Sequence, residues 1–141
     1  MLAYAADLAE INPFWWRLQH DSPRATYDLV HNTVVLDYAE YSLLGSAYHQ
    51  PTKQGGQASL RFLDDAIAAA LRNHDDGGID AIVTAPICKE SWRMVGCRFP
   101  GHTELLAQAC GHDSVAMMLY LSPPNSPPHG LGVAHVTLHT S

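Results

Sequence analysis

Side chains of the kinds that bind anions and move protons gather in one stretch of the chain, residues 79–104. Lys89 follows Pro86, and the pair His102 and Thr103 comes after Gly101. A lysine can pair with a phosphate or carboxylate or serve an acid–base step. A His-Thr pair before a helix places hydrogen-bond donors beside the positive end of the helix dipole, which favours anions. The plainer readings are a solvated surface lysine, a turn histidine and a threonine that caps the helix.

A second group of chemically active residues lies in the apolar segment Leu131–Thr140, which is predicted to be a strand. His135 and His139 have the spacing that brings two imidazoles to one metal ion on a helix. On a strand the same spacing spans about 13 Å, from a rise of about 3.3 Å per residue. Metal–nitrogen bonds are about 2.0–2.1 Å long, so only one of the two is expected to be a ligand.

The elements that must position these residues alternate between helix and strand. Leucine and isoleucine recur at helical spacing between residues 57 and 73 and predict a helix. Ile79–Thr84 is short, rich in β-branched residues and bounded by glycines and Pro86, which predicts a buried strand. Open α/β sheets bind ligands beyond the carboxyl ends of such strands, and Lys89 follows this one. The alternation predicts an α/β fold.

Shorter elements complete this pattern. Helices are expected over Lys89–Val95, closed by Gly96, and over Glu104–Cys110, capped by Thr103 and closed by Gly111. The remaining strands are expected in segments of apolar and β-branched residues: Phe14–Leu18, Asn32–Asp37, Val115–Leu121 and Leu131–Thr140.

Composition excludes several classes of protein. A hydrophobic share of 47% over 141 residues is that of one globular domain at most. A net charge of −6 with eight scattered lysines and arginines excludes a nucleic-acid-binding surface. No apolar run has the length of a membrane span, so no membrane partner is expected. Three cysteines without a CxxC pair fit reduced thiols, and a cytoplasmic protein is therefore expected.

Two joined motifs carry a family resemblance. The sequence T-A-P-I-C-K-E at residues 84–90, followed by P-G-H-T-E at residues 100–104, resembles the 4-hydroxythreonine-4-phosphate dehydrogenase family of pyridoxal phosphate biosynthesis. The resemblance implies that His102 and Thr103 bind the phosphorylated substrate and makes Lys89 a candidate catalytic residue whose role stays open. The segment V-A-H-V-T-L-H, ending at His139, is similar to the family strand whose last histidine binds the catalytic metal.

The resemblance also implies a fold and a reaction. Expected are an isocitrate/isopropylmalate-dehydrogenase-like α/β fold with a mostly parallel sheet, a homodimer, NAD or NADP, and a divalent metal (Zn, Co or Mg). The reaction implied is oxidation and decarboxylation of 4-hydroxy-L-threonine 4-phosphate, a small phosphorylated hydroxy-amino acid, to 3-amino-2-oxopropyl phosphate. Alternatives are a dehydrogenase of D-threonate or D-erythronate 4-phosphate and a catalytically inactive remnant.

The resemblance is uneven along the chain. Residues 55–141 match the family well and residues 1–54 weakly, which predicts one partial α/β domain from the interior of a longer enzyme. The chain contains no GxGxxG motif, so cofactor-binding residues cannot be assigned from its sequence. The 141-residue chain alone is therefore expected to be inactive.

Overall fold

The computed structural model describes residues 6–22, 33–41, 50–112, 114–122 and 130–135. It is a mixed α/β structure that divides into two compact units, Met1–Pro100 and Gly101–Ser141. This division does not test the single partial domain that the sequence predicts. Among the described residues, no helix combines the length and the apolar character that crossing a membrane requires.

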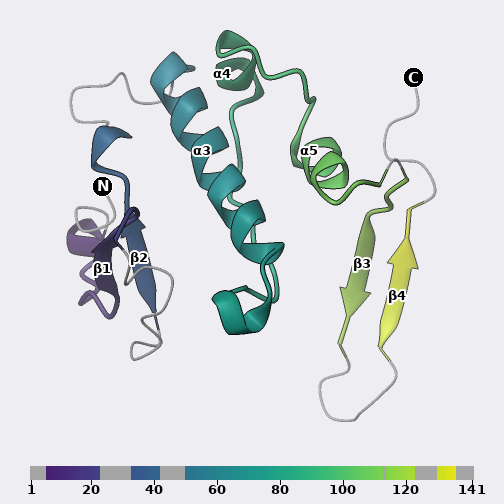
Figure 1. Cartoon of the computed structure of the whole chain (residues 1–141), viewed down its shortest axis with the longest axis horizontal. Helices are drawn as coiled ribbons and strands as arrows, with labels where there is room; N and C mark the ends of the chain where they lie inside the picture. Colours follow the sequence, from purple (N-terminus) through teal and green to yellow (C-terminus); the bar gives the residue numbers. More distant parts are fainter. Residues whose placement is uncertain (1–5, 23–32, 42–49, 113, 123–129, 136–141) are drawn as a thin grey trace. The chain divides into compact units, whose positions relative to one another are not determined.

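A two-stranded parallel sheet forms part of the first unit (Figure 1). Strand β1 (Trp16–Gln19) pairs with β2 (Val34–Asp37) in a register that places Trp16 opposite Val34. The Arg17 side chain forms an ion pair with Asp37 across the two strands. Both strands were predicted, each within about two residues of its observed start, and their parallel pairing agrees with the expected fold class.

Helix α3 (Lys53–Ala70) is the longest described element of the first unit. Thr52 is its N-cap, and the Thr52 Oγ1 accepts a hydrogen bond from the Gly55 N–H at 3.0 Å. The helix therefore begins a few residues before the predicted start at residue 57. Sequence reasoning placed the start too late because Gly55 and Gly56 are weak helix formers, whereas the cap and close packing hold them in the first turn.

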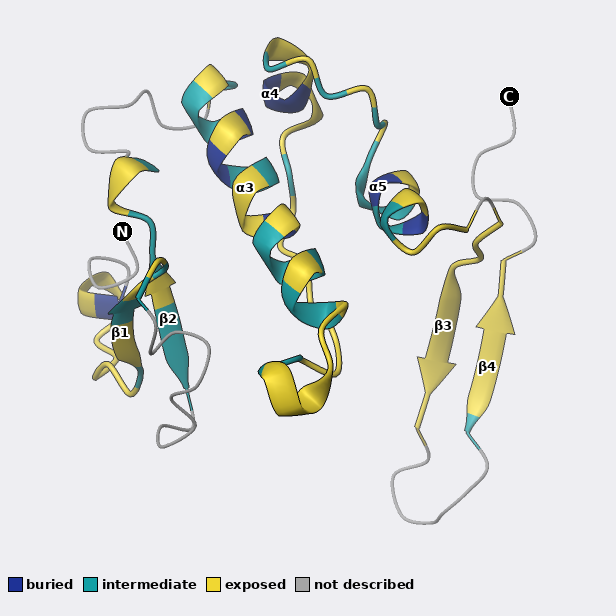
Figure 2. Ribbon diagram, viewed as in Figure 1, coloured by how far each residue is buried: buried dark blue, intermediate teal, exposed yellow. Residues whose placement is uncertain are grey.

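Helix α4 (Lys89–Met94) packs against α3 through small and buried residues (Figure 2). Trp92 is only 1% exposed, and its indole Nε1–H donates to the Ser59 Oγ at 2.9 Å. Ser91 is 4% exposed, and its Oγ accepts from the Thr52 N–H at 3.0 Å. A Cβ added to Gly56 would lie 2.2 Å from the Ser91 carbonyl oxygen, so the two backbones meet directly.

The ends of α4 agree with the prediction. The helix stops at Met94, one residue before the predicted Val95, and Gly96 follows with a left-handed φ of 79°. Glycine adopts this conformation without a steric cost, which explains why it ends the helix.

The predicted buried strand Ile79–Thr84 is wrong. Two short 3-10 helices flank α3: η1 (Ala39–Tyr41) precedes it and η2 (His74–Asp76) follows it. After η2 the chain has no regular structure until α4 begins at Lys89. Val83 is 97% exposed. A β-branched composition fits a pleated, half-buried surface, but a strand also needs a neighbour for its ladder hydrogen bonds. The β1–β2 sheet, as described, does not extend to this segment.

The second unit contains helix α5 (His102–Ala109) and an antiparallel hairpin of β3 (Met118–Leu121) and β4 (Leu131–Ala134). Helix α5 buries Leu105 and Ala107. The continuous apolar run Val115–Leu121 predicts a buried strand, but all eight hairpin residues are exposed, so this prediction is wrong.

The hairpin also departs from the expected mostly parallel sheet. Apolar composition cannot tell a parallel from an antiparallel partner, because pairing is decided by the connection between the strands. The isocitrate/isopropylmalate-dehydrogenase-like arrangement stays a prediction.

The contact between α3 and α4 predicts the effect of a methyl group at Gly56. The substitution Gly56→Ala should lower the free energy of unfolding by about 1–3 kcal/mol, because the added Cβ meets backbone atoms that cannot rotate away. Urea denaturation measures this change.

Gly55→Ala is the matched control in the same helical turn. It receives the same gain in helix propensity, about 1 kcal/mol, and its Cβ would meet only the Thr52 Oγ1, at 3.0 Å. Its stability should stay within about 1 kcal/mol of that of the unsubstituted protein. Equal stabilities for the two variants would contradict the close backbone contact.

Candidate functional site

The predicted substrate-binding pair occupies the first turn of helix α5. His102 and Thr103 are the first two helical residues, and both are half-buried. The N-cap is Gly101, with an extended backbone (φ −178°, ψ −169°), so the prediction that Thr103 caps the helix is wrong. Thr103 lies two positions after the N-cap, inside the first turn of the helix. The first backbone N–H groups of a helix have no partner within it, and they face the same end as these two side chains.

Lys89 is the first residue of α4 and its side chain is exposed. It belongs to the first unit, whereas His102 and Thr103 belong to the second. The structure thus places the His-Thr pair on one helical turn and Lys89 at the start of a different helix.

Cys88, the N-cap of α4, lies directly before Lys89. Hydrogen bonding from the Ser91 side chain, and then from the Ser91 backbone, lowers the pKa of the Cys88 thiol because it stabilises the thiolate. The Cys88 side chain makes no capping hydrogen bond to the backbone of α4. The Ser91 oxygen also accepts a hydrogen bond from the Thr52 N–H at 3.0 Å.

The predicted metal ligand His139 lies outside the described residues. His135 follows β4, is exposed, and its backbone N–H donates to the Met117 carbonyl at 2.8 Å. In the described part of the chain, no group of three or more His, Cys, Asp or Glu side chains is arranged to hold a metal ion. The assignment of the metal to His139 therefore stays a prediction.

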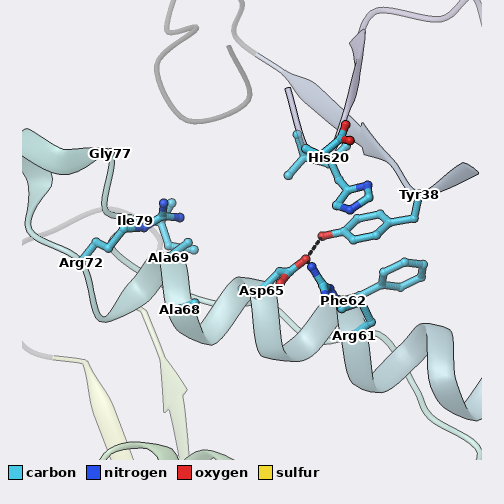
Figure 3. Close-up of a pocket in the computed structure, with 13 residues that line it drawn as sticks. His20, Tyr38, Arg61, Phe62, Asp65, Ala68, Ala69, Arg72, Gly77 and Ile79 are labelled. Carbon is cyan, nitrogen blue, oxygen red and sulfur yellow. Dashed lines mark hydrogen bonds and ion pairs between the residues drawn. The ribbon is translucent and has the colours of Figure 1, made fainter. Parts of the chain in front are cut away.

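A pocket in the first unit was not predicted from the sequence (Figure 3). Its volume is about 910 Å³, and it is lined on one side by α3 and on the other by the ends of β1 and β2. The Tyr38 hydroxyl donates to the Asp65 Oδ2 at 2.7 Å, and the Arg61 Nε donates to the same oxygen at 3.0 Å. The His20 ring stacks on Tyr38 with centroids 4.2 Å apart and an interplanar angle of 11°.

The polar groups of this pocket are joined mainly to each other. Burial, followed by the hydrogen bond to Asp65, raises the pKa of the Tyr38 hydroxyl well above its usual range. Asp65 accepts hydrogen bonds from both Tyr38 and Arg61. These bonds connect the segment after β2, which contains Tyr38, to helix α3. The spacing of Arg61 and Asp65 at i, i+4 gave a sequence signal for one pair. Tyr38 is 27 residues from Asp65, and no local pattern reports such a contact.

Comparison with known proteins gives one family. The family model described as "Pyridoxal phosphate biosynthetic protein PdxA" matches residues 3–141. No solved structure matches the chain.

Curated relatives carry two names. The chain is 46% identical over 88 residues to a 4-hydroxythreonine-4-phosphate dehydrogenase of Geobacter metallireducens, covering 60% of this chain and 25% of the relative. It is 36% identical over 114 residues to the enzyme of the same name from Synechococcus sp. (strain JA-3-3Ab), covering 72% and 32%. It is 43% identical over 84 residues to a D-threonate 4-phosphate dehydrogenase of Cupriavidus necator, covering 60% and 22%. The chain thus spans about a quarter of the length of these relatives.

The Tyr38–Asp65 hydrogen bond predicts the effect of removing the phenol oxygen. The substitution Tyr38→Phe should lower the free energy of unfolding by about 1 kcal/mol at neutral pH, since it removes one hydrogen bond and leaves Arg61 on Asp65. Tyr41→Phe is the control, because the Tyr41 ring packs edge-on against Phe62 and the substitution keeps that ring.

The same pair of variants tests the raised pKa of Tyr38. A group whose pKa is raised by folding adds stability below its unfolded pKa, about 10 for tyrosine, and this stability is lost as the pH rises above that value. Denaturation measured from pH 8 upward should therefore show a smaller fall in stability for Tyr38→Phe than for Tyr41→Phe. Parallel pH profiles would contradict the raised pKa.

Proposed function

Because the chain belongs to the pyridoxal phosphate biosynthetic protein PdxA family, we propose that the protein at its native length oxidises and decarboxylates 4-hydroxy-L-threonine 4-phosphate. The product is 3-amino-2-oxopropyl phosphate, and NAD or NADP accepts the hydride. The observation that carries this proposal is the family match over residues 3–141, which includes both motifs that hold Lys89 and the His102–Thr103 pair. The proposal includes a homodimeric, cytoplasmic enzyme with an isocitrate/isopropylmalate-dehydrogenase-like fold.

The first turn of α5 suits the phosphate of this substrate. A phosphate placed there receives backbone N–H groups, the positive helix end and the side chains of His102 and Thr103. The extended Gly101 before the helix has no side chain to keep the ligand away. Glu104, in the same turn, is exposed, so solvent screens its repulsion of the phosphate.

In the proposed reaction, the residues of this chain bind the substrate and transfer protons. Oxidation at C3 removes a hydride from carbon and a proton from the hydroxyl, and loss of CO₂ then leaves an electron pair that must gain a proton. Lys89 is exposed at the start of α4 and is available to exchange one of these protons or to pair with a substrate anion.

A divalent metal (Zn, Co or Mg) is part of the proposal, with His139 as a ligand. Tight protein metal sites use three or more ligands, and the described residues contain no such group.

D-threonate 4-phosphate is the second candidate substrate, favoured by the 43% identity to the Cupriavidus necator dehydrogenase of that name. Both substrates carry a phosphate, a carboxylate and a C3 hydroxyl, and they differ by an amino or hydroxyl group at C2. The residues assigned above recognise only the shared groups. NADH formation with each substrate separates the two candidates, and no turnover of either by the native-length protein would contradict the dehydrogenase proposal.

Phosphate binding at α5 predicts a change in KM. The substitution Thr103→Val should raise KM about ten- to a hundredfold, the effect of losing one hydrogen bond to a charged group, about 1.5–3 kcal/mol. Gln108→Ala, at an exposed position of the same helix, is the control and should leave KM unchanged. An unchanged KM in Thr103→Val would remove this residue from the substrate site.

The metal assignment predicts a separate effect. His139→Ala should abolish metal-dependent turnover, because a lost imidazole ligand weakens the site that holds the ion. Turnover is measured after removing metal with a chelator and adding back Zn²⁺, Co²⁺ or Mg²⁺. His135→Ala is the control, and a variant at His139 that keeps full activity would refute the assignment.

A further inference from the structure

Helix α4, whose first residue is the candidate catalytic Lys89, is too short to be stable by itself. Isolated helices shorter than about 12 residues are marginal in water, so tertiary contacts must fix this six-residue helix. Lys89 itself is exposed and cannot supply them. Other residues of α4 must therefore fix the position of the backbone at Lys89.

Trp92 fixes the helix from its buried side. The Trp92 backbone N–H donates to the Cys88 carbonyl at 3.2 Å, which holds the peptide unit that joins Cys88 to Lys89. Its indole N–H donates to the Ser59 Oγ, and the Ser59 hydroxyl in turn donates to the Gly56 carbonyl at 3.1 Å. One buried side chain thus connects the peptide before Lys89 to the first turns of α3.

Ser91 makes a second connection to the same point. Its oxygen accepts from the N–H of Thr52, the N-cap of α3, and its hydroxyl stabilises the thiolate of Cys88. The close approach of the Gly56 and Ser91 backbones leaves little room for α4 to shift along α3. Trp92 and Ser91 therefore connect Cys88, the residue directly before Lys89, to the start of α3.

We propose that Trp92 and Ser91 are positioning residues that hold the backbone at Lys89 against the start of α3, so that the lysine reaches the substrate. This inference rests on the proposed function for the role of Lys89, and on the contacts of α3 with α4 for its geometry. Neither residue touches the substrate.

Cys88 offers a readout that does not depend on enzyme activity. Its thiol lies beside Lys89 and reports the Ser91 contact through its pKa. The experiment follows the pH dependence of iodoacetamide alkylation of the Cys88 peptide by mass spectrometry, in the native-length protein and in the variants Trp92→Phe, Ser59→Ala and Ser91→Ala. Steady-state kcat and KM are measured on the same samples.

The expected result is a joint change. In the three variants the pKa of Cys88 should rise toward its ordinary value, slowing alkylation several-fold at neutral pH, and kcat should fall about tenfold or more. Trp16→Phe, at an exposed tryptophan of β1, is the matched control and should change neither quantity. Ser59→Ala removes the acceptor of the indole N–H and the bond to the Gly56 carbonyl but keeps the Trp92 side chain, so it keeps the test available if Trp92→Phe does not fold.

The outcomes separate this inference from the proposed function. Loss of thermal stability with an unchanged Cys88 profile and unchanged kcat would make both residues merely structural and would overturn the inference. A shifted Cys88 profile with unchanged kcat would overturn the link to Lys89. Absence of any turnover in the unsubstituted protein would refute the proposed function, and with it the catalytic purpose of the positioning, whereas a shifted Cys88 profile would still support the positioning geometry.

Discussion

The direct backbone contact between helices α3 and α4 is the constraint on which the described structure of the first unit depends. It exists because Gly56 has no side chain, which lets the Ser91 carbonyl approach where a methyl group would collide. That approach buries Trp92 almost completely and brings its indole within hydrogen-bonding distance of α3. Helix α4 would be only marginally stable alone, and this packing gives it a defined position. The position of Lys89, its first residue, is defined in the same way.

The predicted site residues lie at two helix starts with different properties, one in each unit. Helix α5 presents a half-buried His-Thr pair in a turn suited to a phosphate, whereas α4 presents an exposed lysine held by buried neighbours. In the proposed function, the start of α5 binds the phosphate through its backbone N–H groups and dipole, and the start of α4 supplies the cation Lys89. The proposed reaction needs both, because binding the phosphate does not by itself move a proton.

Motifs and contacts differ in how far they can be predicted. The segments around Lys89 and His102 were found from the sequence because their residues are neighbours in the chain. The pocket network was missed because Tyr38 and Asp65 meet only after α3 packs beside the segment that follows β2. The strand expected at Ile79–Thr84 failed for a related reason: its composition gives a propensity, and a strand requires a partner that propensity cannot supply.

The sequence by itself determined the family motifs, the approximate extents of α3, α4 and α5, and the glycines that end two of these helices, since all of these follow from neighbouring residues. Tertiary structure alone decided that Gly55 and Gly56 lie inside α3, that Thr103 lies within α5 rather than capping it, and that β3 and β4 pair antiparallel. These features depend on how elements pair, pack and begin, which residue propensities alone do not specify.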